Sequence, residues 1–274
     1  MLTRVKELFD AGELGAAVEE LTHQVKAKPG DAAGRTALFV MLCFAGDLDR
    51  AEKQLDALGR ESVEREVGVQ VYRNNVKAER ARRRLFSEGL RPHFITEPPA
   101  YVGLHLSALD RLREGNAPAA KELLERAEEE RHALAGLWGG SEFQDFRDYD
   151  DLVGPVLELV VKDRYTWLPF EQVGRLEIDA PKHLRDLVWA PARILMPDGS
   201  AGEVFIPALY AGSSDHHDDQ VRLGRLTEWL EAGEGIYRGA GLRMFLVDGE
   251  ARAMFEARAV EFRPAPPAAE PAAS

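Results

Sequence analysis

The seven residues AGELGAA at positions 11–17 return, with small changes, as AGDLDRA at positions 45–51. The offset of 34 residues is the period of the tetratricopeptide repeat, which is a pair of packed helices. In each copy a glycine lies where the first helix of a pair ends, and an alanine lies where the second helix packs closely against it. Pro29 follows the first copy where that second helix should end. The chain is therefore predicted to begin with stacked helical pairs.

A weaker third copy lies about two further periods along the chain. It consists of Gly115, Asn116, Ala120, Leu124 and Ala127. The unit between, around residues 78–85, is too degenerate to align. Helical pairs bury their apolar faces only against their neighbours, and stacking curves the array, so we expect a concave surface that takes a helix or an extended peptide. The alternative is a closed bundle of helices with no bound partner.

The second half of the chain is predicted to be rich in strands. The helical part should run to about Leu137 and end at Gly139-Gly140, because paired glycines favour a helix end. Beyond them, β-branched and aromatic clusters alternate with proline and glycine. The segments 197–199 (Pro-Asp-Gly) and 248–249 (Asp-Gly) predict the turns of two hairpins, although the alanine-rich second arm of the latter leaves a helix open.

Two short helices are expected among these strands. They are PKHLRDLVW at 181–189, started by its proline, and DQVRLGRLTEWLEAG at 219–233. The fold class predicted is therefore an α+β multidomain chain. Residues 1–140 form all-α tetratricopeptide-like repeats, 141–263 form a smaller mixed α+β domain with antiparallel hairpins, and 264–274 form a disordered Pro/Ala tail.

Composition narrows the classes of function. The chain has 274 residues, 45% of them hydrophobic, and a net charge of −12, nearly all of it from the second half. The absence of a long apolar run or a signal peptide predicts a cytoplasmic protein with no membrane partner. An acidic protein repels phosphate backbones, so no nucleic acid is expected. The one basic segment is interpreted as a solvated helix surface: Lys77, Arg80, Arg82, Arg83 and Arg84.

Two clusters are candidates for metal binding. The first consists of Asp145, Asp148, Asp150 and Asp151. The second consists of Asp215, His216, His217, Asp218 and Asp219. The first lacks the glycine and closing glutamate of an EF-hand loop, and adjacent histidines point in different directions. We expect caps instead: Asp148 or Asp150 for a turn at Leu152, and Asp218 or Asp219 for the helix that follows.

Other reactive side chains fit structural roles. Cys43 lies in the apolar run ALFVMLCFAG and is expected to be a buried thiol. His105 and His132 lack partners at ligand spacing. Ser213 and Ser214 lack the G-x-S-x-G elbow, and no glycine-rich nucleotide loop occurs. The tryptophans expected to anchor the second domain's core are Trp167, Trp189 and Trp229. No catalytic, cofactor-binding or metal-binding residue is assigned.

Several long motifs occur in a fixed order over nearly the whole chain. They are LFDAGELGAAVEEL, FQDFRDYDDLVGPVLEL, YTWLPFEQV, HLRDLVWAPA, GEVFIPALYAGS and RLGRLTEW. In these motifs the sequence resembles the ImpE or TagJ (SciE-type) accessory proteins of bacterial type VI secretion.

The resemblance implies a helical N-terminal part, a mixed α+β C-terminal part and no catalytic residues. It also implies a non-catalytic adaptor that contacts an N-terminal helix of the smaller sheath protein, TssB, and that assists sheath handling by the ClpV ATPase. Two alternatives stay open. One is a metal-dependent enzyme that uses Asp145, Asp148, His216 and His217, and the other is a general assembly chaperone or scaffold.

Overall fold

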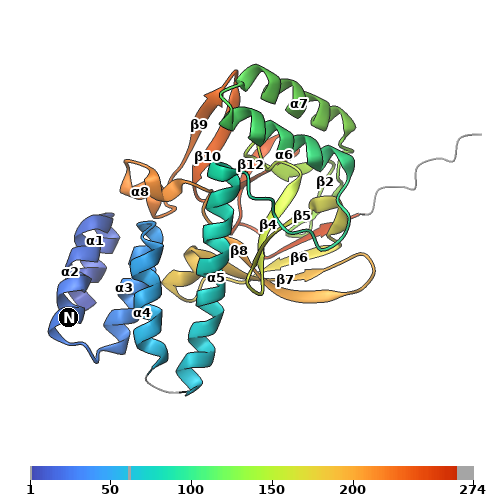
Figure 1. Cartoon of the computed structure of the whole chain (residues 1–274). Coiled ribbons are helices and arrows are strands. Elements are labelled where there is room, and N and C mark those ends of the chain that lie inside the picture. The colour runs from blue at the N-terminus through green and yellow to red at the C-terminus, as the bar shows by residue number, and fades with distance from the viewer. Residues whose placement is uncertain (1, 61–62, 264–274) are drawn as a thin grey trace, which may run out of the picture.

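The computed structural model describes residues 2–60 and 63–263 (Figure 1). Helices fill the first part of the chain, and strands dominate the rest. The helices are α1 (Leu2–Ala11), α2 (Leu14–Ala27), α3 (Ala32–Phe44), α4 (Leu48–Gly59), α5 (Val63–Glu88), α6 (Ala100–Arg113) and α7 (Ala117–Glu130). The first five stand side by side, and α6 and α7 pack together at the far end of α5 (Figure 1). The tail predicted to be disordered, 264–274, lies outside the described residues.

The repeat predicted from the sequence is confirmed in its details. Gly12, Gly46 and Gly115 each close the first helix of a pair, with φ of 81°, 79° and 76°. L-residues with a side chain rarely adopt such angles, which explains the glycines. The alanines at the matching positions, Ala17, Ala51 and Ala120, are all 0% exposed. The degenerate middle unit is part of the single 26-residue helix α5.

The second part consists of antiparallel sheets. Its strands are β1 (Gly136–Trp138), β2 (Ser141–Phe143), β3 (Phe146–Asp148), β4 (Val156–Val161), β5 (Arg164–Pro169), β6 (Arg175–Ile178), β7 (Trp189–Leu195), β8 (Ala201–Pro207), β9 (Thr227–Gly233), β10 (Ile236–Gly241), β11 (Met244–Val247), β12 (Glu250–Ala253) and β13 (Ala259–Phe262). The main sheet has the order β2-β1-β13-β6-β7-β8-β4-β5, and β12-β11-β3 and β10-β9 form two smaller sheets. One face of the main sheet packs on a phenylalanine cluster that includes Phe146, Phe170, Phe245 and Phe262.

Both predicted hairpins are confirmed. The turn around Asp198 joins β7 to β8, and the turn around Asp248 joins β11 to β12, so the alanine-rich second arm is a strand. The predicted end of the helical part is wrong. Helix α7 ends at Glu130, and Gly139 and Gly140 form the turn between β1 and β2. Glycines with positive φ suit a hairpin turn as well as a helix end, so the pattern does not separate the two.

The two helices predicted in the second part are also corrected. The segment at 181–189 contains only a 3₁₀ turn, Leu184–Leu187, before β7 begins. The segment at 219–233 contains the short helix α8 (Asp219–Arg222) and then strand β9. Gly224, with φ of 68°, ends the helical path. Trp229 then packs on the rings of Tyr149 and Tyr210, which favours an extended strand over the expected helix.

The helical array and the sheet share one hydrophobic core. Trp189 on β7 stacks on Phe39 of α3, with ring centroids 6.4 Å apart. Phe205 on β8 packs against Tyr72 of α5, also at 6.4 Å. Trp189 is only 2% exposed, and it belongs to the same cluster as the buried faces of α1 to α5. The chain's own sheet therefore fills part of the concave face that we expected a partner to occupy.

The turns of the repeats are covered by the loop around α8. Asp219 accepts a hydrogen bond from the backbone N–H of Leu14, at 2.8 Å. Arg222 donates to the carbonyl oxygen of Ala45, at 3.5 Å. A Cβ atom on Gly46 would lie 2.6 Å from Oγ of Ser214, so this turn has room only for glycine. The second part of the chain thus fixes the relative positions of the first two helical pairs.

Candidate partner-binding groove

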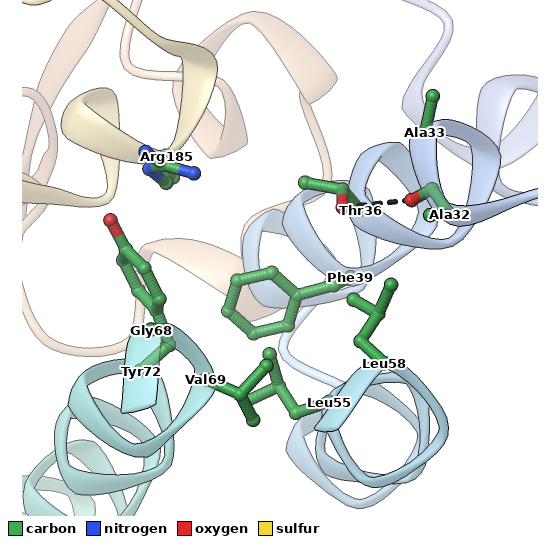
Figure 2. A pocket seen from close by; sticks show the side chains of 10 residues that line it. All are labelled: Ala32, Ala33, Thr36, Phe39, Leu55, Leu58, Gly68, Val69, Tyr72 and Arg185. Atoms are coloured by element: carbon green, nitrogen blue, oxygen red, sulfur yellow. Dashed lines mark hydrogen bonds between the residues drawn. The ribbon is translucent and has the colours of Figure 1, made fainter. Parts of the chain in front are cut away.

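One part of the concave face of the array stays open. It is a groove of about 370 Å³ between α3, α4 and α5, closed at one end by the 3₁₀ turn before β7 (Figure 2). The lining residues are Ala32, Ala33, Thr36, Phe39, Leu55, Leu58, Gly68, Val69, Tyr72 and Arg185. Nine of these ten belong to helices of the array. The groove is thus the open remainder of the predicted cradle, and most of its lining is apolar.

Small residues keep the groove open. Asp31 caps α3 by accepting a hydrogen bond from the N–H of Gly34. Helix α3 therefore begins at Ala32, and Ala32 and Ala33 line the groove. Across from them, Gly68 lies in the interior of α5, and a Cβ atom there would meet nothing within 4 Å. Glycine in a helix costs roughly 1 kcal/mol relative to alanine. The chain therefore carries an unfavourable residue at the place where a larger side chain would narrow the groove.

Aromatic rings form the floor and one wall. Phe39 lies in the middle of the groove with Leu55 and Val69 beside it (Figure 2). Its ring meets the edge of Tyr72, with centroids 5.9 Å apart. The tyrosine hydroxyl points toward Arg185, whose guanidinium carbon lies 4.9 Å from the ring centroid (Figure 2). Burial raises the pKa of Tyr72, and the nearby Arg185 offsets part of that rise.

Arg185 is the polar feature of the groove. Its Nε atom is buried and has no hydrogen-bond partner in the described part of the chain. The nearest carboxylate oxygen in an ion pair, on Asp186, is 4.0 Å from Nε. A buried N–H without an acceptor is unfavourable by about 1–3 kcal/mol. The rest of the guanidinium is part-exposed at the groove, where a guest could bring a carboxylate or carbonyl oxygen to it.

The first candidate metal cluster is taken up by structural bonds. Asp145 pairs with Arg131, and this guanidinium outweighs burial and holds the pKa of Asp145 below its ordinary value. Asp148 is 0% exposed and pairs with Arg243 and the hydroxyl of Tyr210. The cluster therefore presents no free carboxylates at these two positions.

The other two acids of that cluster are also engaged, and one of them forms the cap predicted from the sequence. Asp150 caps the turn at Leu152 by accepting its N–H at 2.8 Å, and burial raises the pKa of Asp150 to about 7. Asp151 pairs with Arg147 at 3.3 Å.

The second candidate cluster is divided among separate partners. His216 accepts a hydrogen bond from the N–H of Asp218, and its Nε2 lies 3.2 Å from Glu228. Asp218 caps α8 through the N–H of Gln220, as expected. His217 lies with its ring centroid 4.4 Å from that of His216. Among residues 2–60 and 63–263, no group of three or more histidine, cysteine, aspartate or glutamate side chains is arranged to hold a metal ion.

The basic segment of α5 is only in part the solvated surface that we expected, since Lys77 and Arg84 are exposed but Arg82 is not. Arg82 is 2% exposed and donates from Nε and Nη2 to Glu158 of β4, both at 2.8 Å. Arg83 donates to the carbonyl oxygen of Gly46. A run of basic residues in a helix usually indicates an exposed surface. The burial of Arg82 could not be predicted because its partner, Glu158, lies far away in the sequence. This segment joins the two parts of the chain.

The remaining candidates have structural places. Cys43 is buried, and burial raises the pKa of its thiol well above the ordinary value, which disfavours the reactive thiolate. His105 is buried, with Nδ1 3.2 Å from the carbonyl oxygen of Leu152, whereas His132 is exposed. The hydroxyl of Ser213 donates to the Tyr210 carbonyl oxygen at 2.7 Å and therefore has no base as partner. Trp167 and Trp189 are buried as predicted, and Trp229 is partly exposed.

Similarity to known proteins identifies the family of this chain. The family model described as ImpE protein matches residues 140–261. The chain is also 37% identical over 259 residues to the type VI secretion system accessory component TagJ of Pseudomonas aeruginosa, which covers 94% of this chain and 91% of that protein. The chain belongs to the ImpE family. Its resemblance to TagJ, expected from the motifs, is thereby confirmed.

The fold is shared with a solved structure. An X-ray structure of a protein from Vibrio parahaemolyticus matches with a TM-score of 0.88 and 28% identity, covering 95% of this chain and 98% of that one. The combination of a helical array and an antiparallel sheet is thus not peculiar to this chain. No helix in the described part of this ImpE-family chain is long and apolar enough to cross a membrane.

Proposed function

We propose that this chain is a non-catalytic adaptor of bacterial type VI secretion that holds an amphipathic helix of a partner protein in the groove between α3, α4 and α5. The observation that carries the proposal is the open apolar groove in the part of the chain built from helical repeats. The similarity to TagJ supports the secretion context. The partner proposed is the N-terminal helix of the smaller sheath protein, TssB, in the cytoplasm, and sheath handling by the ClpV ATPase is the process served.

The groove fits one face of a helix better than a polar ligand. Phe39, Leu55, Leu58 and Val69 offer apolar contacts, and a helix presents apolar side chains at spacings of three and four residues. The small side chains of α3 let such residues enter. We expect an acidic side chain, or a free carbonyl oxygen at the end of the guest helix, to lie at the part-exposed guanidinium of Arg185.

The test replaces Gly68 in the full chain. Leucine at this position has open space in the free protein and improves helix propensity, so the fold should be kept while the groove is filled. Gly103 of α6 is the matched control, since it is also an exposed glycine inside a helix, with nothing within 4 Å of its Cβ position. Binding of the purified smaller sheath protein would be measured by isothermal titration calorimetry.

The proposal expects Gly68→Leu to weaken binding at least tenfold, about 1.4 kcal/mol, and Gly103→Leu to leave it unchanged. Equal affinities for both variants and the original chain would reject the groove as the binding site. If even the original chain fails to bind the sheath protein, the identity of the partner is wrong. A general assembly scaffold would then be the remaining interpretation, and cross-linking of the groove in native cells would identify its partner.

The metal-dependent enzyme is the weaker alternative. The acids it would use are engaged with arginines and backbone N–H groups, as Asp145 and Asp148 are. His216 is held by Asp218 and Glu228 rather than by His217 or an acid of the first cluster. Elemental analysis of the folded chain would decide the matter, because a stoichiometric metal ion would revive this alternative.

A further inference from the structure

A second hollow lies along α5, between this helix and the face of the main sheet that carries Pro191 and Phe205. Its volume is about 670 Å³. Val71, Asn74 and Asn75 of α5 form one wall, and residues of β4, β6, β7 and β8 form the other. This volume is within the range of about 300–1,000 Å³ that is usual for ligand sites. The groove of Figure 2 shares no lining residue with it.

The sheet side of the hollow carries charged side chains in a row. Arg193 of β7 lies directly between Glu203 of β8 and Glu177 of β6 in the strand register. Lys162, in the turn that follows β4, also lines the hollow. Within the described part of the chain, Lys162, Arg193 and Glu203 make no ion pair. Basic and acidic side chains thus lie side by side on adjacent strands, and Glu177 is engaged with Arg175 at 2.8 Å.

An apolar row runs beside the charged one. Pro191 and Phe205 are paired across β7 and β8, and Val160 is paired with Phe205 across β4 and β8. All three line the hollow, two residues along their strands from the charged positions. A guest that fits this wall therefore needs both apolar and charged side chains at short spacing.

The side-chain carboxamide of Asn75 is suited to bind the backbone of a guest polypeptide. It is 1% exposed and lines the hollow, yet neither Oδ1 nor Nδ2 has a hydrogen-bond partner in the described part of the chain. Leaving a buried carboxamide without partners is strongly unfavourable. One carboxamide offers a donor and an acceptor side by side, which is the complement of a peptide group that has its own N–H and C=O free.

We propose that this hollow binds an extended segment of a partner polypeptide, with the carboxamide of Asn75 turned onto one of its peptide groups. A helix is the wrong guest here because its peptide groups are bonded to one another. An extended segment keeps its peptide groups free for Asn75, and the side chains that it turns toward the sheet meet Pro191 and Phe205 and the neighbouring charges of Arg193 and Glu203. This second site goes beyond the helix-binding groove and does not depend on it.

The experiment uses the full chain and a defined probe, a phage-displayed library of random 12-residue peptides. Peptides would be selected on the original protein and counter-selected on Asn75→Leu, which replaces the carboxamide with an apolar side chain of similar shape. Selected peptides would then be synthesised, labelled with fluorescein and titrated by fluorescence anisotropy. We expect at least a tenfold loss of affinity with Asn75→Leu and with Arg193→Ala, and no loss with Gly68→Leu, which fills the other groove.

Two further readouts separate binding from structure. The midpoint of urea unfolding should rise in Asn75→Leu, because the unpaired polar group is removed, and a lower midpoint would show that the fold itself uses Asn75 and would overturn the proposal. Transferred nuclear Overhauser effects of the bound peptide should show the strong Hα to HN contacts of an extended chain. A helical pattern, or a selection that yields no peptide sensitive to Asn75→Leu, would equally overturn it.

Discussion

Arg82 of α5 and Glu158 of β4 form a two-pronged ion pair in the interior of the protein. Nε and Nη2 of Arg82 each lie 2.8 Å from an oxygen of the Glu158 carboxylate, and the two residues are 2% and 1% exposed. The same carboxylate accepts from Arg243, which also binds Asp148. Although burial works against the charged form, the two guanidinium groups outweigh it and lower the pKa of Glu158. This cluster fastens the helical array to the sheet.

Glu158→Gln should destabilise the protein by about 3–5 kcal/mol, because it leaves two buried guanidinium groups without a full counter-charge. Asp49→Asn is the control. Asp49 pairs with Arg80, which lies on α5 as Arg82 does, but Asp49 is 84% exposed. An exposed pair contributes about 1 kcal/mol or less. Urea unfolding monitored by tryptophan fluorescence measures both changes. Similar losses for the two variants would contradict the role assigned to the buried cluster.

His105 should make stability depend on pH. Burial lowers the pKa of His105 to about 4, from an ordinary value near 6.5. Between these values the unfolded chain binds a proton that the folded chain excludes, so the free energy of unfolding falls as the pH falls from 6.5 toward 4. From pH 7 to pH 5 this amounts to about 2 kcal/mol. Between pH 7 and pH 5 the free energy of unfolding of His105→Gln should therefore fall by about 2 kcal/mol less than that of the original chain. Equal falls in the two proteins, measured by urea titration, would refute the lowered pKa of His105.

Gly46→Ala and Gly115→Ala form a matched pair. Both glycines have positive φ, so alanine costs about 1–2 kcal/mol in backbone strain at either position. At Gly46 the new Cβ would also lie within 2.8 Å of both Oγ and Cβ of Ser214, whereas at Gly115 nothing lies within 4 Å. Thermal unfolding should therefore show a clearly larger loss for Gly46→Ala. Equal losses would mean that the loop carrying Ser214 does not rest on the repeat.

We expect the helical part to fail as an isolated fragment, although the repeat pattern suggests that residues 1–140 could fold and bind alone. Phe39 and Tyr72 are covered by Trp189 and Phe205 from the sheet, and Arg82 would lose Glu158. The fragment should show a broad, uncooperative thermal transition by circular dichroism, against one sharp transition for the full chain. A sharply melting fragment would show that the two parts are independent domains.

The repeat could be predicted from sequence because its signals are local. Gly12 and Gly46 each need a positive φ, and the small alanines that follow them pack one helix on the next, so spacing alone reveals the helical pairs. The hairpin turns at Asp198 and Asp248 are local in the same sense. The helix expected at 219–233 was wrong because contacts of Trp229 with Tyr149 and Tyr210 override its helical spacing.

The site could be predicted only in outline. A concave helical surface follows from stacking, but the part of it that stays open depends on where Trp189 and Arg185 arrive from the sheet. These are contacts over more than a hundred residues, which no spacing rule records. The hollow beside Asn75 could not be predicted for the same reason, since two adjacent asparagines in a charged helix give no sign that one of them is buried.

The most direct measurement places a photo-cross-linker in the groove. Ala33 is exposed at the groove's edge, and Cys43, the chain's single cysteine, is buried, so Ala33→Cys can be labelled selectively with benzophenone maleimide. Mixed with the smaller sheath protein and illuminated, it should cross-link to residues three or four apart on one apolar face of that protein's N-terminal helix. The same label at Gly103→Cys should give none. No cross-link from position 33, or an equal yield from position 103, would contradict a partner helix in this groove.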